Sequence, residues 1–109
     1  MHRLERLSED MQLLISKIVQ QELKNPDIDG IISITKVDIT PDQKYAKVHT
    51  SIYGANDKDA VLAALKKSAG FVRKQMSQRL KLRNAPELTF VMDESIEYGA
   101  HINEVLKNI

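Results

Sequence analysis

The segment from Ile31 to Tyr53 reads IISITKVDI-TPDQ-KYAKVHTSIY and gives the clearest structural signal in the chain. Ile31–Ile39 is rich in β-branched residues, which is typical of a half-buried strand. Thr40–Gln43 follows as a tight turn with proline at its second position. In Lys44–Tyr53 small or apolar residues then alternate with larger polar ones, and the expected inward positions are Ala46, Val48, Thr50 and Ile52. Two strands around so short a turn predict an antiparallel hairpin.

A helical segment follows the hairpin, and Asn56 or Asp57 is placed to cap its start. Apolar residues spaced three or four apart predict one continuous buried stripe, formed by Val61, Leu65, Ala69, Val72, Met76 and Leu80. The small residues Ser68-Ala69-Gly70 interrupt it, and glycine weakens a helix interior by about 1 kcal/mol relative to alanine. We therefore expect a kink here, or a close approach by another backbone. Phe71 lies off the apolar stripe; it either packs under the bend, which we favour, or forms an exposed contact.

A first helix is predicted before the hairpin. Its apolar residues recur at helical spacing at Leu7, Met11, Leu14, Ile15 and Ile18. Ser8 precedes two acidic residues and suits the N-cap position. Asn25-Pro26 should end the helix, because the residue before proline avoids the α conformation.

The last third of the chain predicts one more strand and a C-terminal helix. Leu88–Met92 is a short run of strand-forming residues, and Asp93-Glu94-Ser95 then opens a helical segment with apolar positions up to Ile109. The order is helix, strand, strand, helix–helix, strand, helix. Three strands with helices covering one face give an α+β two-layer fold, and we expect residues 1–109 to form a single domain.

The composition is that of an ordinary globular protein. Of the 109 residues 42% are hydrophobic and 28% are charged, which argues against disordered, collagen-like and coiled-coil classes. The absence of cysteine excludes disulfide scaffolds, cysteine-ligated metals and thiol catalysis. There is no apolar run of the ~18 residues that a membrane span requires, and the start lacks the apolar core of a secretory signal. We therefore expect a cytoplasmic protein without membrane contact.

The net charge of +1 conceals an uneven distribution. The stretch from Ala60 to Pro86 holds seven of the 16 basic residues and none of the 15 acidic ones. A solvated surface helix usually mixes both signs, because opposite charges at i,i+4 stabilise it. A run of cations without carboxylates instead favours contact with a polyanion.

Catalytic interpretations have little support. His49 faces outward and could pair with Asp38 across the hairpin, but no nucleophile with an oxyanion donor accompanies them. Asp93, Glu94 and Glu97 could hold Mg²⁺, although helix capping explains these carboxylates better. Phosphate-binding loops, dinucleotide fingerprints and zinc spacings are all absent from the sequence. We predict no enzyme, no metal and no cofactor.

Several strings resemble the ribosome-binding factor A family of bacterial small-subunit maturation factors. They follow one another over nearly the whole chain: Arg3 and Arg6, Thr40-Pro41-Asp42 with Tyr45-Ala46-Lys47-Val48, Gly70-Phe71-Val72-Arg73, Leu80-Lys81-Leu82-Arg83, Pro86-Glu87-Leu88-Thr89-Phe90 and Asp93-Glu94-Ser95-Ile96-Glu97. Each string alone is weakly specific, whereas their ordered sum is highly specific.

The resemblance implies a type II-like KH-like fold of the order α-β-β-α-kink-α-β. In this family a helix–kink–helix replaces the Gly-x-x-Gly loop of standard KH domains. The family's Ala-x-Gly kink signature corresponds here to Ser68-Ala69-Gly70, with serine in place of alanine. The Asp-Pro-Arg string that usually follows the first helix is Asn25-Pro26-Asp27 in this chain, so one basic contact is missing.

The resemblance also implies a function. We expect a non-catalytic, monomeric factor that binds 16S rRNA and the free or immature 30S subunit. It should assist late 30S maturation and rRNA processing and contribute to cold adaptation. An assembly GTPase is a further expected partner. The expected RNA-binding residues are Arg3, Arg6, Lys66, Lys67, Ser68, Ala69, Gly70, Arg73, Lys74, Arg79, Lys81 and Arg83. Among these, Arg79 falls toward the apolar side of a straight helix.

The sequence leaves two alternatives open, one for the function of the chain and one for the role of two tyrosines. The chain could be a protein-docking module that uses its sheet edge or C-terminus to bind a ribosomal protein or an assembly GTPase. Tyr45 and Tyr53 share one face of their strand, where they could stack on a base or simply cover the edge of the sheet.

Overall fold

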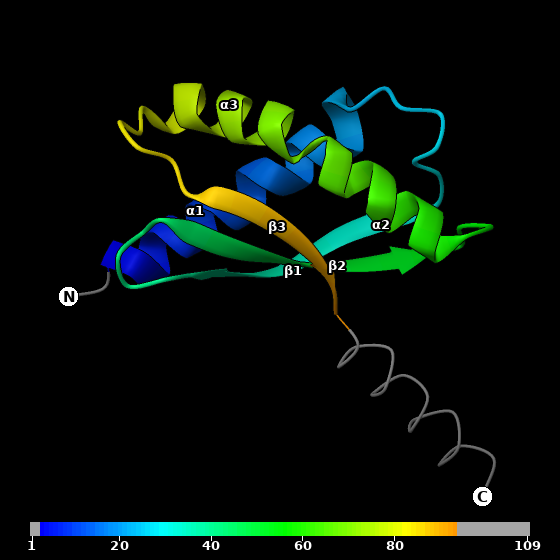
Figure 1. Cartoon of the computed structure of the whole chain (residues 1–109), viewed down its shortest axis with the longest axis horizontal. Coiled ribbons are helices and arrows are strands. Elements are labelled where there is room, and N and C mark those ends of the chain that lie inside the picture. Colours follow the sequence, from blue (N-terminus) through cyan, green and yellow to red (C-terminus); the bar gives the residue numbers. More distant parts are fainter. Residues whose placement is uncertain (1–2, 94–109) are drawn as a thin grey trace, which may run out of the picture.

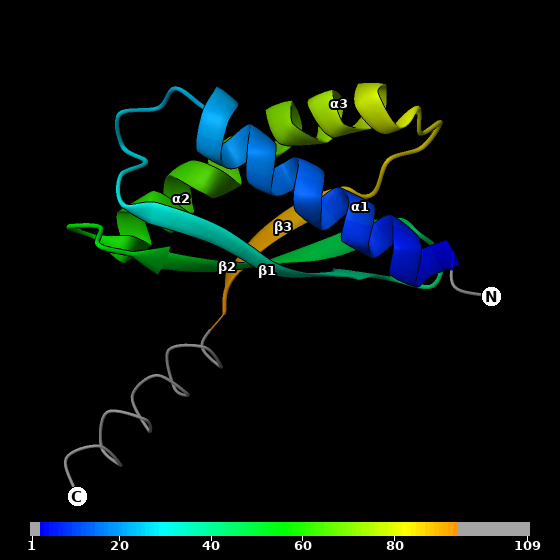
Figure 2. The same ribbon diagram turned by 180° about the vertical axis from the view of Figure 1, so that it is seen from behind.

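The computed structural model describes residues 3–93, which form a mixed three-stranded sheet with the described helices on one face (Figures 1 and 2). The strand order is β1-β2-β3. β1 (Ile31–Ile39) pairs antiparallel with β2 (Tyr45–Tyr53), and β3 (Glu87–Met92) pairs parallel with β2. The α+β class and the KH-like element order are confirmed.

The predicted hairpin is present. The register places Ile31 opposite Tyr53, and the chain reverses through a turn in which Gln43 adopts a left-handed conformation with φ of 61°. The inward positions predicted for β2 are all buried. β1 contains one bulge, at Thr35, which the alternation in the sequence did not predict.

The first helix begins earlier than expected. α1 spans Arg3–Lys17, so Ser8 lies inside the helix and the N-cap prediction for it is wrong. Good helix formers precede Ser8 and extend the helix upstream. The Ser8 hydroxyl instead donates a hydrogen bond to the backbone carbonyl of Val37 in β1.

The end of the first helix also differs from the prediction. After α1 the chain continues as a π-helix, η1 (Ile18–Glu22), which ends three residues before Asn25. The Leu23 amide donates to the carbonyl of Ile18 at 3.0 Å, the five-residue spacing of a π-turn. Leu23 is extended, so the helix stops before Pro26 acts on it.

Polar side chains of the first helical segment cover the outer edge of β1. The Gln12 amide nitrogen donates to the carbonyl oxygen of Ile34 at 3.1 Å, and that of Gln20 donates to the carbonyl of Ile32 at 2.8 Å. An open strand edge invites pairing with other chains. These contacts satisfy the edge carbonyls and dock the helix against the sheet.

The predicted kink is present. α2 (Lys58–Lys67) and α3 (Ala69–Leu80) are separated by Ser68, whose hydroxyl donates to the carbonyl of Ala64 at 3.0 Å. Back-bonding of this kind bends helices. Asp57 caps α2 by accepting from the Ala60 amide, as predicted. The stripe faces the sheet, with Val61, Leu65, Val72 and Met76 buried.

β3 is the last described strand, and it contributes Phe90, the largest fully buried side chain of the described core. The Glu87 amide donates to the carbonyl of Lys44 at 2.8 Å and starts the parallel pairing with β2. The C-terminal helix predicted after Asp93 lies outside the described residues.

Candidate nucleic-acid interface

Five cations of the helix pair and the following loop are exposed and without ion-pair partners among residues 3–93. We call this set the basic helix surface. It consists of Lys66, Lys67, Lys74, Lys81 and Arg83. Because no described carboxylate neutralises these side chains, their charge is available to an external anion.

Two of these cations share a depression with Gly70 beside the kink. This hollow of about 280 Å³ is lined by Gly70, Lys74 and Arg83, together with Arg73, Ser77, Asn84 and Ala85. Two exposed cations at a shallow, open surface suit an RNA phosphate, which needs charge rather than deep burial.

Gly70 leaves this surface open. A Cβ atom added to Gly70 would meet no atom of the described chain within 4 Å, and the residue has no left-handed backbone angle that would require glycine. Neither packing nor backbone conformation within the described chain therefore explains the glycine. A close approach by a partner backbone, as the sequence suggested, fits this open position. Ala69 is half-buried beside Ser68.

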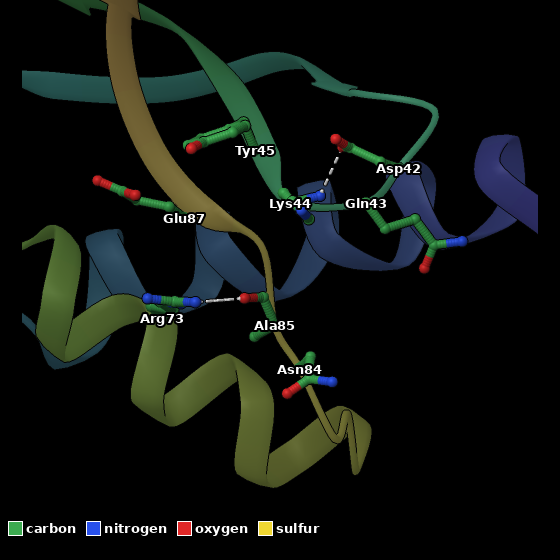
Figure 3. Close-up of a pocket in the computed structure, with 8 residues that line it drawn as sticks. All are labelled: Asp42, Gln43, Lys44, Tyr45, Arg73, Asn84, Ala85 and Glu87. Atoms are coloured by element: carbon green, nitrogen blue, oxygen red, sulfur yellow. Dashed lines mark hydrogen bonds between the residues drawn. The ribbon is translucent and has the colours of Figure 1, made fainter.

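Two predicted RNA-binding arginines make contacts within the chain. Arg73 donates from Nε and Nη2 to the carbonyl of Ala85, at 3.1 and 2.6 Å (Figure 3). This bond holds the loop before β3 against α3. Arg79 forms a bidentate ion pair with Glu22, with Nη1 2.6 Å from Oε2. Arg79 thereby ties α3 to η1, and its guanidinium is not free for phosphate.

The Arg79–Glu22 pair predicts a pH-dependent stability. The hydrogen bond from the Arg79 guanidinium holds the pKa of the Glu22 carboxyl below its ordinary value of 4.5. A lowered pKa adds stability above the unfolded-state value and loses it as the pH falls through the folded-state value. We expect Glu22→Gln to lower stability near pH 7, and the deficit to close below about pH 4.5.

Urea unfolding of both proteins at a series of pH values measures this difference. Glu9→Gln is the matched control, since Glu9 is exposed on α1 and has no partner among the described residues. A deficit that stays constant from neutral to acidic pH would contradict the role given to Arg79.

The remaining predicted cations lie elsewhere. The first turns of α1, which contain Arg3 and Arg6, lie beside the β1–β2 turn and away from the kink (Figures 1 and 2). Arg6 is exposed. The start of α1 therefore does not lie beside the kink of the helix pair (Figures 1 and 2).

Phe71 departs from its prediction. Its side chain is 45% exposed rather than packed under the bend. α3 turns Val72 and Met76 toward the core, and Phe71 is left at the polar boundary of the helix. This places an aromatic group next to Gly70, on the same segment as the exposed cations.

The histidine and aspartate considered for catalysis form a surface pair, whereas Glu94 and Glu97 of the acidic cluster lie outside the described residues. His49 Nε2 lies 3.0 Å from a carboxylate oxygen of Asp38, across the hairpin as expected. Within residues 3–93 no three acidic, histidine or cysteine side chains gather as metal ligands would. Over the same range, no helix combines the length and the apolar character needed to cross a bilayer.

Several neighbours of the site were not identified in the sequence. Glu22 and Ala85 each bind an arginine of α3, but they are 57 and 12 residues distant from it. Lys44, Asn84 and Glu87 line a second hollow together with Arg73. No local pattern marks such residues, because their proximity comes from tertiary contacts: the packing of α3 against η1 and the loop before β3, and the pairing of β2 with β3.

Comparisons with known proteins agree with this architecture. A family model described as ribosome-binding factor A matches residues 3–106. The chain is 48% identical over 109 residues to ribosome-binding factor A of Clostridium kluyveri, covering 99% of this chain and 90% of the relative. It is 45% identical over 107 residues to that of Acetivibrio thermocellus, covering 97% and 87%.

Solved structures show the same fold. The crystal structure of ribosome-binding factor A from Thermus thermophilus superposes with a TM-score of 0.74 at 17% identity, over 82% of this chain and 93% of that one. A Thermus thermophilus homology model, fitted into a cryo-EM map of a 30S–RbfA complex, gives 0.68 at 18% identity, over 87% and 97%. With a family match over most of its length and several relatives above 40% identity, the chain belongs to the ribosome-binding factor A family.

Proposed function

We propose that this protein binds the free or immature 30S subunit through its 16S rRNA and assists late maturation and rRNA processing without catalysing a reaction. The names of its relatives and the 30S complex of the Thermus thermophilus protein support ribosome binding. The observation that carries the proposal is the basic helix surface, whose five cations have no described partner and two of which, Lys74 and Arg83, share a hollow with an open glycine.

The mechanism is binding to the RNA backbone. Lysine and arginine neutralise phosphates and release counterions, which gives affinity that depends strongly on salt and weakly on sequence. Folded RNA is recognised largely by shape and backbone. A protein without chemistry shifts an RNA equilibrium only by binding one arrangement more tightly than another. The factor would thus favour one rRNA conformation during maturation.

Crosslinking tests the location of the contact. A photoreactive residue at Lys67 or Lys74, in protein bound to particles from slowly maturing cells, should crosslink to 16S rRNA at defined nucleotides. The same probe at Lys17, exposed at the end of α1, should give few crosslinks. Crosslinks to RNA from Lys17 alone would show that another surface faces the subunit.

Gly70→Ala should separate binding from folding. The added methyl group meets nothing in the described chain and alanine favours helix, so stability should be unchanged or rise by up to about 1 kcal/mol. The same methyl group should weaken subunit binding several-fold, because it blocks the approach of an RNA backbone. Co-sedimentation and urea unfolding measure the two effects.

Ala60→Ser is the control for Gly70→Ala. It adds one heavy atom at an exposed position in the first turn of α2, and binding should not change. Undiminished binding by Gly70→Ala would remove the kink from the proposed contact.

We extend the proposal to a cytoplasmic monomer that supports growth in the cold, with an assembly GTPase as a further partner. Complementation at low temperature with wild-type and Gly70→Ala protein tests the link between kink and growth. Sedimentation of the isolated protein tests the monomer.

One observation favours a second function, protein docking. The sheet face away from the helices exposes Ile31 and Tyr53, which are register partners and are 66% and 72% exposed. A paired apolar surface of this kind suits a protein partner. If a protein partner docks on this face, its binding to the chain should be insensitive to salt and should be lost in the Tyr53→Ser variant.

A further inference from the structure

A second hollow lies next to the basic helix surface. It has a volume of about 470 Å³, within the roughly 300–1,000 Å³ range of small-molecule sites. It opens between the β1–β2 turn, α3 and the start of β3 (Figure 3). Its lining residues are Asp42, Gln43, Lys44, Tyr45, Arg73, Asn84, Ala85 and Glu87.

Tyr45 and Glu87 come from neighbouring strands on one side of this hollow. They are register partners in the parallel pairing of β2 with β3, and both side chains are exposed (Figure 3). Neither the Tyr45 hydroxyl nor the Glu87 carboxylate has a hydrogen-bond partner among the described residues. An aromatic face and an acceptor-only group thus stand side by side and unused.

Arg73 and Asn84 contribute from the side of α3. Arg73 uses Nε and Nη2 to hold the Ala85 carbonyl, which fixes the guanidinium and leaves Nη1 without a partner among the described residues. The other carboxylate of the hollow, Asp42, accepts from the Thr40 hydroxyl at 2.6 Å and the Lys44 amide at 3.0 Å. Both bonds are to Oδ1 and hold Asp42 in its turn, whereas neither carboxylate oxygen of Glu87 has a partner among the described residues.

The two hollows adjoin. Arg73, Asn84 and Ala85 line both of them, and the first also contains Lys74 and Arg83. A nucleic-acid strand whose phosphates lie on Lys74 and Arg83 would therefore pass beside the hollow that Tyr45 and Glu87 line. Single-stranded RNA is commonly recognised by stacking on aromatic groups and hydrogen bonding to base edges.

We infer that this hollow binds an unpaired guanine nucleotide of the RNA, with Tyr45 stacking on the base and Glu87 accepting from its Watson–Crick edge. Guanine presents two adjacent donors there, N1–H and the N2 amino group, which match a carboxylate. Adenine, cytosine and uracil each place an acceptor beside their donor, and that acceptor would face the carboxylate. The inference rests on the proposed RNA-binding function and specifies a base for it.

Fluorescence anisotropy with a short oligouridine containing one central guanosine tests the inference. Replacing guanosine by inosine removes only the N2 amino group and should weaken binding about tenfold, the effect of losing one base-edge contact. Glu87→Gln should weaken guanosine binding about tenfold and abolish the difference from inosine. Glu9→Gln is the control and should keep that difference.

The sign of the Glu87→Gln effect is decisive. If Glu87 only repels phosphate, removing its charge strengthens RNA binding, so equal or tighter binding of the guanosine oligonucleotide overturns the inference. Equal binding of guanosine and inosine by the wild-type protein overturns it without any variant. Free guanosine monophosphate tests whether the ligand is a free nucleotide or a base within RNA. If it binds as tightly as the oligonucleotide, recognition of guanine within RNA is overturned.

The failure of this inference is distinguishable from failure of the proposed function. Loss of guanine preference together with salt-dependent binding of small subunits leaves the proposed function intact and overturns only the base site. Salt-independent binding of small subunits, by contrast, overturns the proposed function.

Discussion

Reversal of Lys67, Lys74 and Lys81 to glutamate should reduce binding to small ribosomal subunits by at least about 100-fold at physiological salt. All three lysines are exposed and unpaired within the described chain, so their replacement breaks no hydrogen bond or ion pair of the described residues. Each phosphate contact contributes about 0.9 to the slope of log affinity against log salt, so the slope should fall by about 3. Co-sedimentation across a salt series measures both quantities.

A charge-matched control distinguishes a local contact from a general charge effect. Lys17, Lys24 and Lys47 are also exposed but lie outside the basic helix surface, and their reversal changes the net charge equally. We expect it to weaken binding by only a few-fold. An equal loss from both triple variants would show that overall charge governs binding, and retention of binding by the first would refute the interface.

Phe90→Ala should destabilise the fold by about 3–5 kcal/mol. Phe90 is fully buried in β3, where its ring packs in the core between the sheet and the helices. Truncation removes apolar burial and leaves a cavity that rigid neighbours cannot fill. Because domains of this size are stable by only about 5–15 kcal/mol, the loss would be a large part of the total. Urea unfolding followed by far-UV circular dichroism measures it.

Thr89→Ala is the control for Phe90→Ala. Thr89 is the preceding residue of the same strand and points to the exposed face. Its truncation should cost less than about 1 kcal/mol. Similar losses from both substitutions would show that β3 does not anchor the core in the way its burial pattern indicates.

The elements of the fold were predictable where the signal is local. The hairpin, the inward positions of β2, the Asp57 cap and the kink at Ser68 all depend on spacing within a few residues. The N-cap prediction for Ser8 is wrong because a hydroxyl that suits an N-cap equally suits a contact with a strand carbonyl 29 residues away. The π-helix before Leu23 has no sequence signature comparable to a proline or a capping box.

The sequence predicted the charged segment of the candidate site, but not which of its side chains hold partners or lie next to one another. Seven cations without a carboxylate were evident between Ala60 and Pro86. That Arg79 is held by Glu22 and Arg73 by Ala85 depends on the packing of α3 against η1 and the loop before β3. Likewise, Tyr45 and Glu87 become neighbours only through the parallel pairing of two strands.

The amino-acid sequence by itself therefore determined the α+β element order, the bend in the helix pair, the family and the concentration of positive charge. The tertiary structure alone decided which cations are free, which are held by partners, and which side chains share a hollow. The physical reason is that periodicity and capping act between near neighbours in the chain, whereas ion pairing and cavity formation depend on distances in space between residues far apart in sequence.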